Sequence, residues 1–531
     1  MSKPRGLEMT QTERTVAELL PDLLGQGDPY RVVAEEIAGT LSDQDFEEMY
    51  GVRGPVPVSP KMLALVTLFQ FMEKLPDRQA AHMVKVRLDW KSALGLTLGY
   101  GGFHFSILSE FRGRLLASRK AHVVFDRVLG RLVELGLVRA GGRQRLDATH
   151  VVACVRMLSR VEMVTESLRK CVEEVEEVLG EGGTVDLLGE ELLGRACTRP
   201  DLRKLNDKER RRTLVEAGRW AAAVLEAVDG RADPVVRGLG SVRLLRQVVA
   251  QQFRVVSKGE VAPLSNRERK EIPGTERICT PHDPDARYGE KRGKGWVGYK
   301  VEIAETAEAD APNFITEVQV QNAAEPDREA LEAVVERLAE REILPQKMYV
   351  DEGYTSGEKI DTMRQEYGVD LRGPVRQEPQ RGVFPQSAFR IEEDRRIVVC
   401  PQGKESVSWS QAPGGDVQVQ FAESDCAPCP VHDACTKRKG PRCLTVSAHQ
   451  ETLQARRAEQ KEAAFRQEMH RRNAIEGTIS ENKRGRGLDR ARYRGAAKFR
   501  VQAFFSGAAT NVRRLASALT APRKAPAANT T

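Results

Sequence analysis

The order of hydrophobic and polar positions predicts a helical start to the chain. From about residue 10 to 135, apolar residues recur at the spacing of an amphipathic helix, most regularly in SPKMLALVTLFQFMEKL. Ser59 and Pro60 stand where an N-cap and a first helical turn are expected. Short helices with basic residues suit a helix-turn-helix DNA-binding module and an ordinary helical bundle about equally well, because no base-contacting residue can be named.

The centre of the chain predicts a sheet. QRLDATHVVACV, after the Gly141-Gly142 turn, is rich in β-branched residues, and WVGYKVEIAE and NFITEVQVQNA alternate apolar and polar positions as neighbouring antiparallel strands do. KMYVDEGY predicts a further short strand, and Asp327–Glu342 a helix. Helices are expected between residues 156 and 253. Strands and helices in this order predict an α/β core.

The last third of the chain changes character twice. The pattern of residues 352–445 predicts loops and short strands, and this segment holds five of the nine cysteines. The pattern of residues 446–483 predicts a long charged helical stretch. The polar, Pro-containing end, from residue 516, is expected to be disordered.

Composition excludes several classes of protein. The chain has 531 residues, of which 40% are hydrophobic and 30% charged, so it can bury several cores without disulfides. No apolar run approaches the roughly 18 residues that span a bilayer. The start has no apolar signal core, so we expect a cytoplasmic protein with reduced thiols.

Positive charge gathers at the C-terminal end. From Thr436 onward there are 22 Lys/Arg and 7 Asp/Glu, a balance of +15, so the preceding residues carry −8 of the total of +7. Eight Lys/Arg lie between Lys483 and Arg500, interleaved with Tyr493 and Phe499. This pattern suits a polyanion such as DNA, with bases stacked on the rings, about as well as it suits a solvated helix surface.

Three acidic residues are candidate metal ligands. Asp147 lies in the strand LDATHV, Asp351 ends the strand MYVD, and Glu476 lies in RRNAIEGTISENK. Carboxylates that meet at the open edge of an α/β sheet would bind Mg²⁺ or Mn²⁺. Two such ions can activate an attacking oxygen and stabilise the leaving oxygen of a phosphodiester. Taken singly, an Asp after a strand is more often a turn former or a helix cap.

The sequence around these acids resembles bacterial insertion-sequence transposases of the DDE class. The similar blocks, in chain order, are LPDRQAA, LDWKSALGL, FSILSEFRGRL, LDATHV, PHDPDARYGEKRGKGWVGYKVEI, YVDEGYTS and RRNAIEGTISENKRGRGLDRARYRG, within about Pro57–Leu515. The resemblance implies a ribonuclease-H-like catalytic domain. It also implies that Asp147, Asp351 and Glu476 form the DDE triad, which would hold two Mg²⁺ or Mn²⁺ ions.

A family signature, Tyr-x2-Arg-x3-Glu-x6-Lys, supports the third acid. Arg472, Glu476 and Lys483 match it, and Met469 replaces the Tyr. On one helix these three matching residues lie within about 40° of one another, which suits a metal ligand flanked by two DNA-contacting cations. A surface ion pair is the alternative. Glu481 competes as third acid but lies about 140° from Glu476.

The clustered cysteines suggest a second metal site. Cys400, Cys426, Cys429 and Cys435 follow the pattern C-x25-C-x2-C-x5-C, which could hold a structural Zn²⁺ with Cys443 and His432 as spare ligands. Similar cysteine clusters in related transposases imply a small zinc-ribbon-like insertion. Free thiols or a redox pair remain alternatives.

Together these features predict a transposase that binds the terminal inverted repeats of its element and catalyses metal-dependent strand cleavage and strand transfer. Arg472, Lys483, Arg490, Arg492 and Arg494 are expected to contact double-stranded DNA, with a homodimer on DNA and a nucleoid-associated location. The alternatives are a non-catalytic DNA-binding regulator derived from a transposase, and a ribonuclease-H-like nuclease without strand transfer. The expected domains are a helical DNA-binding region (1–135), a catalytic core (140–351 and 446–515) with a helical insertion (about 156–260), a Cys-rich insertion (352–445) and a disordered tail (516–531).

Overall fold

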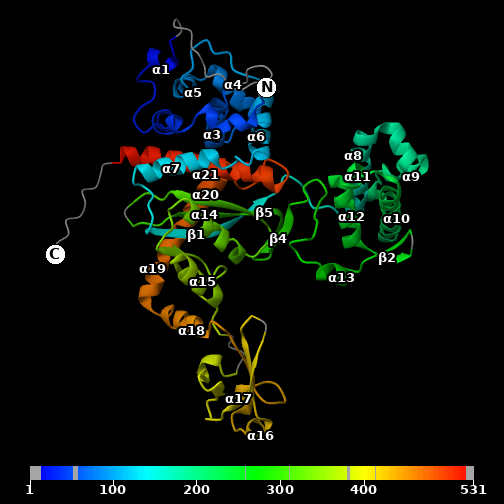
Figure 1. Cartoon of the computed structure of the whole chain (residues 1–531), viewed down its shortest axis with the longest axis vertical. Helices are drawn as coiled ribbons and strands as arrows, with labels where there is room; N and C mark the ends of the chain where they lie inside the picture. Colours follow the sequence, from blue (N-terminus) through cyan, green and yellow to red (C-terminus); the bar gives the residue numbers. More distant parts are fainter. Residues whose placement is uncertain are drawn as a thin grey trace, which may run out of the picture.

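The computed structural model describes residues 14–51, 58–257, 259–309, 311–378, 383–412 and 414–521. Figure 1 shows the N-terminal helices at one end of the long axis and a sheet with its helices in the middle. A helical lobe projects from one side of the sheet, and a Cys-rich lobe lies at the other end of the long axis. Among the described residues, no helix combines the length and apolar character that crossing a bilayer requires.

Short helices form the N-terminal region, as the apolar spacing predicted. They are α1 (Val16–Leu19), α2 (Pro29–Val32), the π-helical turn η1 (Val33–Ile37), the 3-10 turns η2 (Ala38–Thr40) and η3 (Asp43–Met49), α3 (Pro60–Met72), α4 (Asp77–Val86), α5 (Leu88–Ala93), α6 (Ser106–Ala117) and α7 (Val123–Glu134). The Ser59 side chain accepts a hydrogen bond from the Met62 N–H at the start of α3, which confirms the predicted cap. Every residue of α3 except Lys61 is buried.

A six-stranded mixed sheet forms the centre. Its strands are β1 (Arg143–Val152), β4 (Arg287–Lys291), β5 (Lys294–Thr306), β6 (Ile315–Asn322), β7 (Lys347–Tyr349) and β8 (Asp370–Arg372). The order is β4-β5-β1-β7-β8, and β6 also pairs with β5. β1, β4 and β6 are antiparallel to β5, whereas β7 is parallel to β1 and β8 to β7. The predicted α/β class and the strands around Asp147, Trp296, Phe314 and Met348 are confirmed.

Helices from distant parts of the chain cover this sheet. They are α14 (Leu331–Glu340), preceded by the 3-10 turn η5 (Asp327–Glu329), α15 (Gly357–Tyr367), α18 (Gln450–Glu459), α19 (Ala463–Asn473), α20 (Ile475–Arg486) and α21 (Ala496–Thr520). The charged stretch predicted for residues 446–483 is therefore several helices. Helix α21 continues to Thr520, so the predicted tail from residue 516 begins in a helix; residues 522–531 lie outside the described part.

One hydrophobic core joins the N-terminal helices to the sheet. Helix α21 packs on α3 and α7 on one side and on β6 on the other. Phe505 of α21 stacks on Phe71 of α3, with ring centroids 5.7 Å apart, while Phe504 lies 5.9 Å from Phe125 of α7. The N-terminal helices therefore share their core with the sheet.

The predicted helical insertion forms a lobe with a separate core. It contains α8 (Arg160–Leu188), α9 (Glu190–Ala196), the 3-10 turn η4 (Leu202–Lys204), α10 (Asp207–Arg231), α11 (Pro234–Arg237), α12 (Gly240–Gln252), the hairpin of β2 (Phe253–Ser257) and β3 (Glu260–Pro263), and α13 (Asn266–Glu271). Helix α8 is interrupted at Gly180, whose φ of 71° is in the left-handed region that glycine adopts readily. The hairpin was not predicted.

The Cys-rich lobe is smaller than the predicted residues 352–445. Helix α15 and strand β8 lie within that range but belong to the central sheet layer. The lobe itself contains the 3-10 turn η6 (Gln386–Ala388), β9 (Arg390–Glu392), β10 (Ile397–Val399), β11 (Ser406–Gln411), β12 (Val417–Phe421), α16 (Glu423–Cys426), α17 (His432–Cys435) and β13 (Cys443–Val446). A small core including Phe389, Val398 and Phe421 supports it.

The shared core predicts that the N-terminal helices and the sheet lose stability together. Phe505→Ala removes a ring that is 1% exposed and should lower the free energy of unfolding by about 3–5 kcal/mol. Native-state hydrogen exchange should then accelerate in α3 and β6 alike, whereas Leu519→Ala, at a side chain 49% exposed, should change neither. Faster exchange in α3 with β6 unchanged would show that the two regions are separate.

Candidate active site

Asp147 lies in the middle of the sheet. It is in β1, opposite Ile303 of β5, and is 7% exposed. One carboxylate oxygen accepts a hydrogen bond from the Ala148 N–H at 2.8 Å, and the other accepts one from the Arg472 guanidinium at 2.7 Å. Burying an unpaired carboxylate in a sheet costs free energy of folding. Asp147 therefore needs its ion pair with Arg472 at this buried position.

Asp351 follows β7, the parallel neighbour of β1, and is only partly buried. Its Oδ1 accepts a hydrogen bond from the Gly353 N–H at 2.8 Å. A Cβ at position 353 would lie 2.9 Å from the same oxygen, so a glycine lets this turn close around the carboxylate. Because β1 and β7 are adjacent, the two predicted aspartates come from neighbouring strands.

The guanidinium of Arg472 joins these two acids. Its Nη2 lies 2.7 Å from Asp147 Oδ2 and 3.6 Å from Asp351 Oδ2. Burial raises the pKa of Asp147; Arg472 opposes the rise and Asp351 adds to it. The Nε of Arg472 is buried and has no acceptor among the described residues. This cation therefore neutralises two converging carboxylates and still has a hydrogen bond to offer.

Glu476 lies one turn beyond Arg472 and is exposed. The single helix predicted to contain both is wrong, because α19 ends at Asn473 and α20 begins at Ile475. The intervening Ala474 keeps helical angles (φ −66°, ψ −17°), so the change of direction is small. Glu476 has no hydrogen bond or ion pair within the described ranges, which leaves its carboxylate available to a ligand.

Glu481, the competing acid, is already occupied. Its Oε2 lies 2.9 Å from the Arg514 guanidinium, and its Oε1 lies 3.6 Å from that of Arg486. It lies on the side of α20 that packs against α21. This pairing favours Glu476 over Glu481 as the third acid.

A fully buried carboxylate, which the sequence analysis did not single out, anchors α20. Glu305 of β5 accepts hydrogen bonds from Arg145 of β1 at 2.7 Å, Thr478 of α20 at 2.6 Å and Arg514 of α21 at 2.9 Å. Arg145 also donates to the Arg471 carbonyl at the end of α19. An acidic residue on the apolar face of a predicted strand is the signal that could have identified it.

A second buried acid supports the Asp351 loop. Burial raises the pKa of Glu302 to about 8, and Tyr354 donates a hydrogen bond to it. Because Tyr354 is three residues beyond Asp351, this bond holds the turn that presents the aspartate.

The remaining predicted cations differ in availability. Lys483 is half-buried, and burial lowers its pKa, opposed by Asp489. Lys483 and Lys291 both lower the pKa of His150 on β1, whose main depression comes from burial, so positive charge gathers at this end of the strand. The Ala491 N–H donates to the Val152 carbonyl at 2.8 Å, which places the basic segment beside the end of β1.

Arg490 and Arg494 are exposed, but Arg492 is a packing residue. Its guanidinium donates to the Leu75 carbonyl at 2.9 Å and lies over the Phe71 ring, 4.9 Å from the centroid. The predicted stacking of a base on Phe499 is wrong, because that ring is fully buried against Tyr299. Tyr493 is partly buried, and the Arg112 guanidinium lies over its ring, 5.1 Å from the centroid.

The four predicted thiols line one pocket in the Cys-rich lobe. Cys400, Cys426, Cys429 and Cys435 surround a cavity of about 320 Å³ together with His432, whereas Cys443 lies outside it. Burial raises the pKa of Cys435; Arg442 opposes the rise, and the other three thiols add to it. The Lys404 N–H donates to the Cys400 sulfur at 3.3 Å.

Across the described ranges, no group of three or more His, Cys, Asp or Glu side chains has the spacing of a metal site. This holds for the acids and for the thiols. The structure thus brings Asp147 and Asp351 together around Arg472. Glu476 is exposed, one helical turn beyond Arg472.

Comparisons with known proteins identify two segments. Residues 399–516 match the family model described as Transposase DDE domain, and residues 18–114 match Transposase domain (DUF772). The first segment includes Glu476 and the four thiols, and the second covers most of the N-terminal helices. No curated protein matches, and no solved structure matches.

The environment of Arg492 predicts a structural role. Arg492→Ala removes a charged hydrogen bond to a carbonyl and contacts with Phe71, so it should lower the free energy of unfolding by about 1–3 kcal/mol. Arg490→Ala, at an exposed side chain, should leave it unchanged. Denaturant titration of both variants measures the difference, and equal stabilities would refute the packing role of Arg492.

Proposed function

We propose that this protein binds the terminal inverted repeats of its element and cleaves and joins DNA strands. The matches of two segments to transposase family models confirm the predicted kinship with insertion-sequence transposases of the DDE class. The observation that carries the proposal is the Arg472 guanidinium held between Asp147 and Asp351. Two acids from adjacent strands converge on a cation where the fold would place a catalytic pair.

The sheet supports a ribonuclease-H-like core. Strands β6, β5 and β1 form an antiparallel set, and β7 and β8 continue from β1 in parallel. Asp147 lies on the central strand of this order and Asp351 follows the next one, with the insertion lobe between β1 and the remaining strands.

The donor set fits Mg²⁺ or Mn²⁺. Asp147 and Asp351 supply hard oxygen ligands, and the position of Arg472 shows that a positive charge is stable between them. Glu476, exposed and without a partner in the described part of the chain, would supply the third carboxylate. Two bound ions would activate the attacking oxygen and stabilise the leaving oxygen of the phosphodiester.

The cations of the chain then bind and orient the DNA. Arg472 can exchange its carboxylates for a phosphate oxygen, and its buried Nε is a donor that lacks an acceptor among the described residues. Lys483, Arg490 and Arg494 extend the positive surface along the end of β1. Joining two element ends needs two active sites, so we propose a homodimer on DNA, associated with the nucleoid.

The Cys-rich lobe would hold a structural Zn²⁺. Four thiols facing one small pocket have the ligand chemistry of a tetrahedral zinc site, and a backbone N–H donor to Cys400 would support the charge of a thiolate. Among the described residues of this lobe the hydrophobic core is small, with six buried side chains, so a metal would add much of its stability.

The third acid should separate chemistry from DNA binding. Glu476→Gln keeps the size of the side chain but removes a charged ligand, so cleavage of an end-containing duplex in Mg²⁺ should fall by roughly 100-fold or more. DNA binding, measured in the same buffer, should persist.

Glu481→Gln is the matched control for Glu476→Gln. It should lower stability by about 1 kcal/mol, because Glu481 pairs with Arg514, and retain cleavage. Full activity of Glu476→Gln together with Asp147→Asn and Asp351→Asn would refute the DDE mechanism. Cleavage by the wild type without joined products would favour the nuclease alternative.

Zinc content tests the proposed ribbon. Protein purified without chelator should hold about one Zn²⁺ per chain, measured by elemental analysis. Cys429→Ser should lose it and make the lobe sensitive to proteolysis, while Cys443→Ser should keep it because that thiol lies outside the pocket. Metal-free wild-type protein would refute the site.

A further inference from the structure

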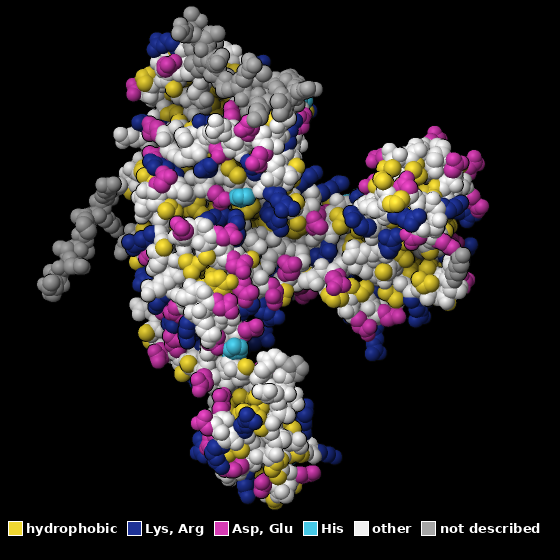
Figure 2. Space-filling model, viewed as in Figure 1, with side chains coloured by type: hydrophobic (Ala, Val, Ile, Leu, Met, Phe, Trp, Pro, Cys, Tyr) yellow, Lys and Arg dark blue, Asp and Glu magenta, His cyan; other side chains and the backbone are white. Residues whose placement is uncertain are grey.

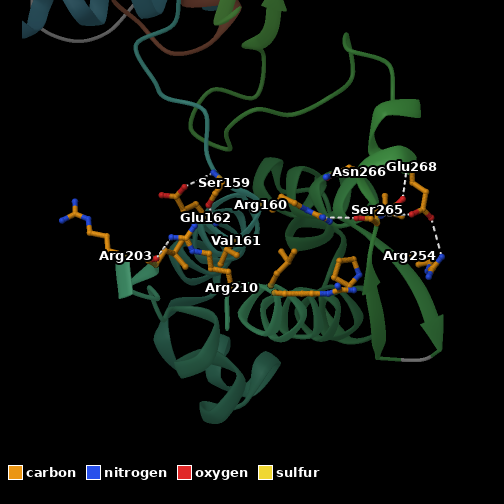
Figure 3. A pocket seen from close by; sticks show the side chains of 15 residues that line it. Ser159, Arg160, Val161, Glu162, Arg203, Arg210, Arg254, Ser265, Asn266 and Glu268 are labelled. Carbon is orange, nitrogen blue, oxygen red and sulfur yellow. Dashed lines mark hydrogen bonds and ion pairs between the residues drawn. The ribbon is translucent and has the colours of Figure 1, made fainter. Parts of the chain in front are cut away.

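A second positively charged surface lies in the helical lobe. A pocket of about 790 Å³ opens between the start of α8, the start of α10 and the turn from β3 into α13. Figure 3 shows Ser159 and Glu162 on one side of it and Ser265, Glu268 and Arg254 on the other, with Arg160 between them. The lining holds five arginines and two glutamates, an excess of positive charge.

The two glutamates of this pocket are already engaged. Glu162 closes the capping box of α8 and pairs with Arg156. Glu268 closes the capping box of α13 and lies 3.6 Å from Arg254. Neither is available to the remaining arginines.

The arginines of this pocket differ in how far their charges are already paired. The Arg160 guanidinium donates hydrogen bonds to the Gln252 side chain and to the carbonyls of Gln252 and Leu264. Arg210 donates only to carbonyls, so its charge is not cancelled. Arg203 and Arg211 are exposed, and their guanidiniums have no hydrogen bond or ion pair within the described ranges. Arg203 and Arg211 are therefore unpaired among the described residues, and Arg210 keeps its net positive charge. All three side chains are exposed to solvent beside the pocket.

This surface continues to the catalytic core. A neighbouring pocket of about 510 Å³ shares Glu162, Leu202 and Arg203 with the first and is also lined by Arg156, Arg199 and Arg494. Arg494 belongs to the basic segment beside β1. Figure 2 shows Lys and Arg side chains gathered where the helical lobe meets the central body.

Electrostatic effects across the junction agree with this geometry. Burial lowers the pKa of Lys170 on α8 and of His282, and Arg494 lowers both further. Cations from the lobe and the core thus lie within reach of one another's field. Such a concentration of like charge is stabilised when a polyanion binds.

We propose that the helical lobe binds the phosphodiester backbone of duplex DNA along a strip from Arg494 through Arg203 to Arg211. The inference rests on the proposed function and adds a second anchoring surface for the DNA held at the active site. An extended polyanion fits better than a compact anion. The available guanidiniums are spread along two joined pockets, and the half-buried Arg160 donates its hydrogen bonds to protein acceptors.

The double variant Arg203→Ala/Arg211→Ala tests the strip. Both side chains are exposed, so folding and thermal stability should not change. The affinity for duplex DNA should fall, and the slope of log K against log salt should decrease by roughly 2, about one for each lost phosphate contact. The probe is a duplex with the terminal repeat and its flanking DNA, titrated between low and physiological salt.

Arg231→Ala/Arg243→Ala is the matched control. It removes the same charge from exposed positions of the same lobe that line neither pocket. Arg231 is twenty residues beyond Arg211 on α10, a separation of about 30 Å. The control should keep the wild-type affinity and salt slope. A loss as large as that of the test variant would overturn the strip, because total charge alone would then explain it.

The outcomes separate this inference from the proposed function. If the wild type does not bind duplex DNA, the proposed function fails. If it binds, and Arg490→Ala/Arg494→Ala weakens binding while Arg203→Ala/Arg211→Ala leaves affinity and slope unchanged, only the strip is overturned. A second outcome would also overturn the strip. In it, inorganic phosphate or pyrophosphate stabilises the wild type but not Arg203→Ala/Arg211→Ala, and both proteins bind DNA equally well. The pocket would then be a site for a compact anion.

Discussion

Glu305, a carboxylate with no exposure to solvent, constrains the arrangement of the whole catalytic layer. Arg145, Thr478 and Arg514, from three other elements, all donate to it. A buried charge that loses a partner is strongly destabilising, so β1, β5, α20 and α21 can meet in only one arrangement. That arrangement fixes the end of α19 over the sheet and places Arg472 against Asp147. The active-site geometry thus depends on a polar contact that takes no part in the chemistry.

The same packing connects the site to the rest of the protein. Helix α21, which supplies Arg514 to the Glu305 network, also packs on α3 and α7, so the N-terminal helices share one core with the sheet. The helical lobe, with its own core, extends the positive surface that begins at Arg494. We infer that DNA lies along the junction between the central body and this lobe. The Cys-rich lobe lies at the far end of the long axis (Figure 1).

Periodicity was sufficient for elements whose burial repeats regularly. The alternation in WVGYKVEIAE predicted β5, and the spacing in SPKMLALVTLFQFMEKL with its Ser59 cap predicted α3. The sequence pattern led to a wrong prediction where basic and aromatic side chains pack against distant parts of the chain. Arg492, Tyr493 and Phe499 have the pattern of a DNA-contacting segment, yet they pack against side chains of α3, α6 and β5 respectively. Whether a basic or aromatic side chain faces solvent depends on what packs over it, and that partner is distant in sequence.

The sequence by itself determined the α/β class, the strands of Asp147 and Asp351 and the cysteine cluster. Each follows from the local spacing of residues or from a motif that can be recognised without knowing the tertiary contacts. Only the tertiary structure decided that Arg472 bridges the two aspartates and that Glu481 pairs with Arg514. It also decided that β8 completes the sheet, with α15 packed beside it. These facts depend on hydrogen bonds and ion pairs between residues tens to hundreds of positions apart. The orientation of a charged side chain is set by the partner that relieves its desolvation, and no local pattern encodes that partner.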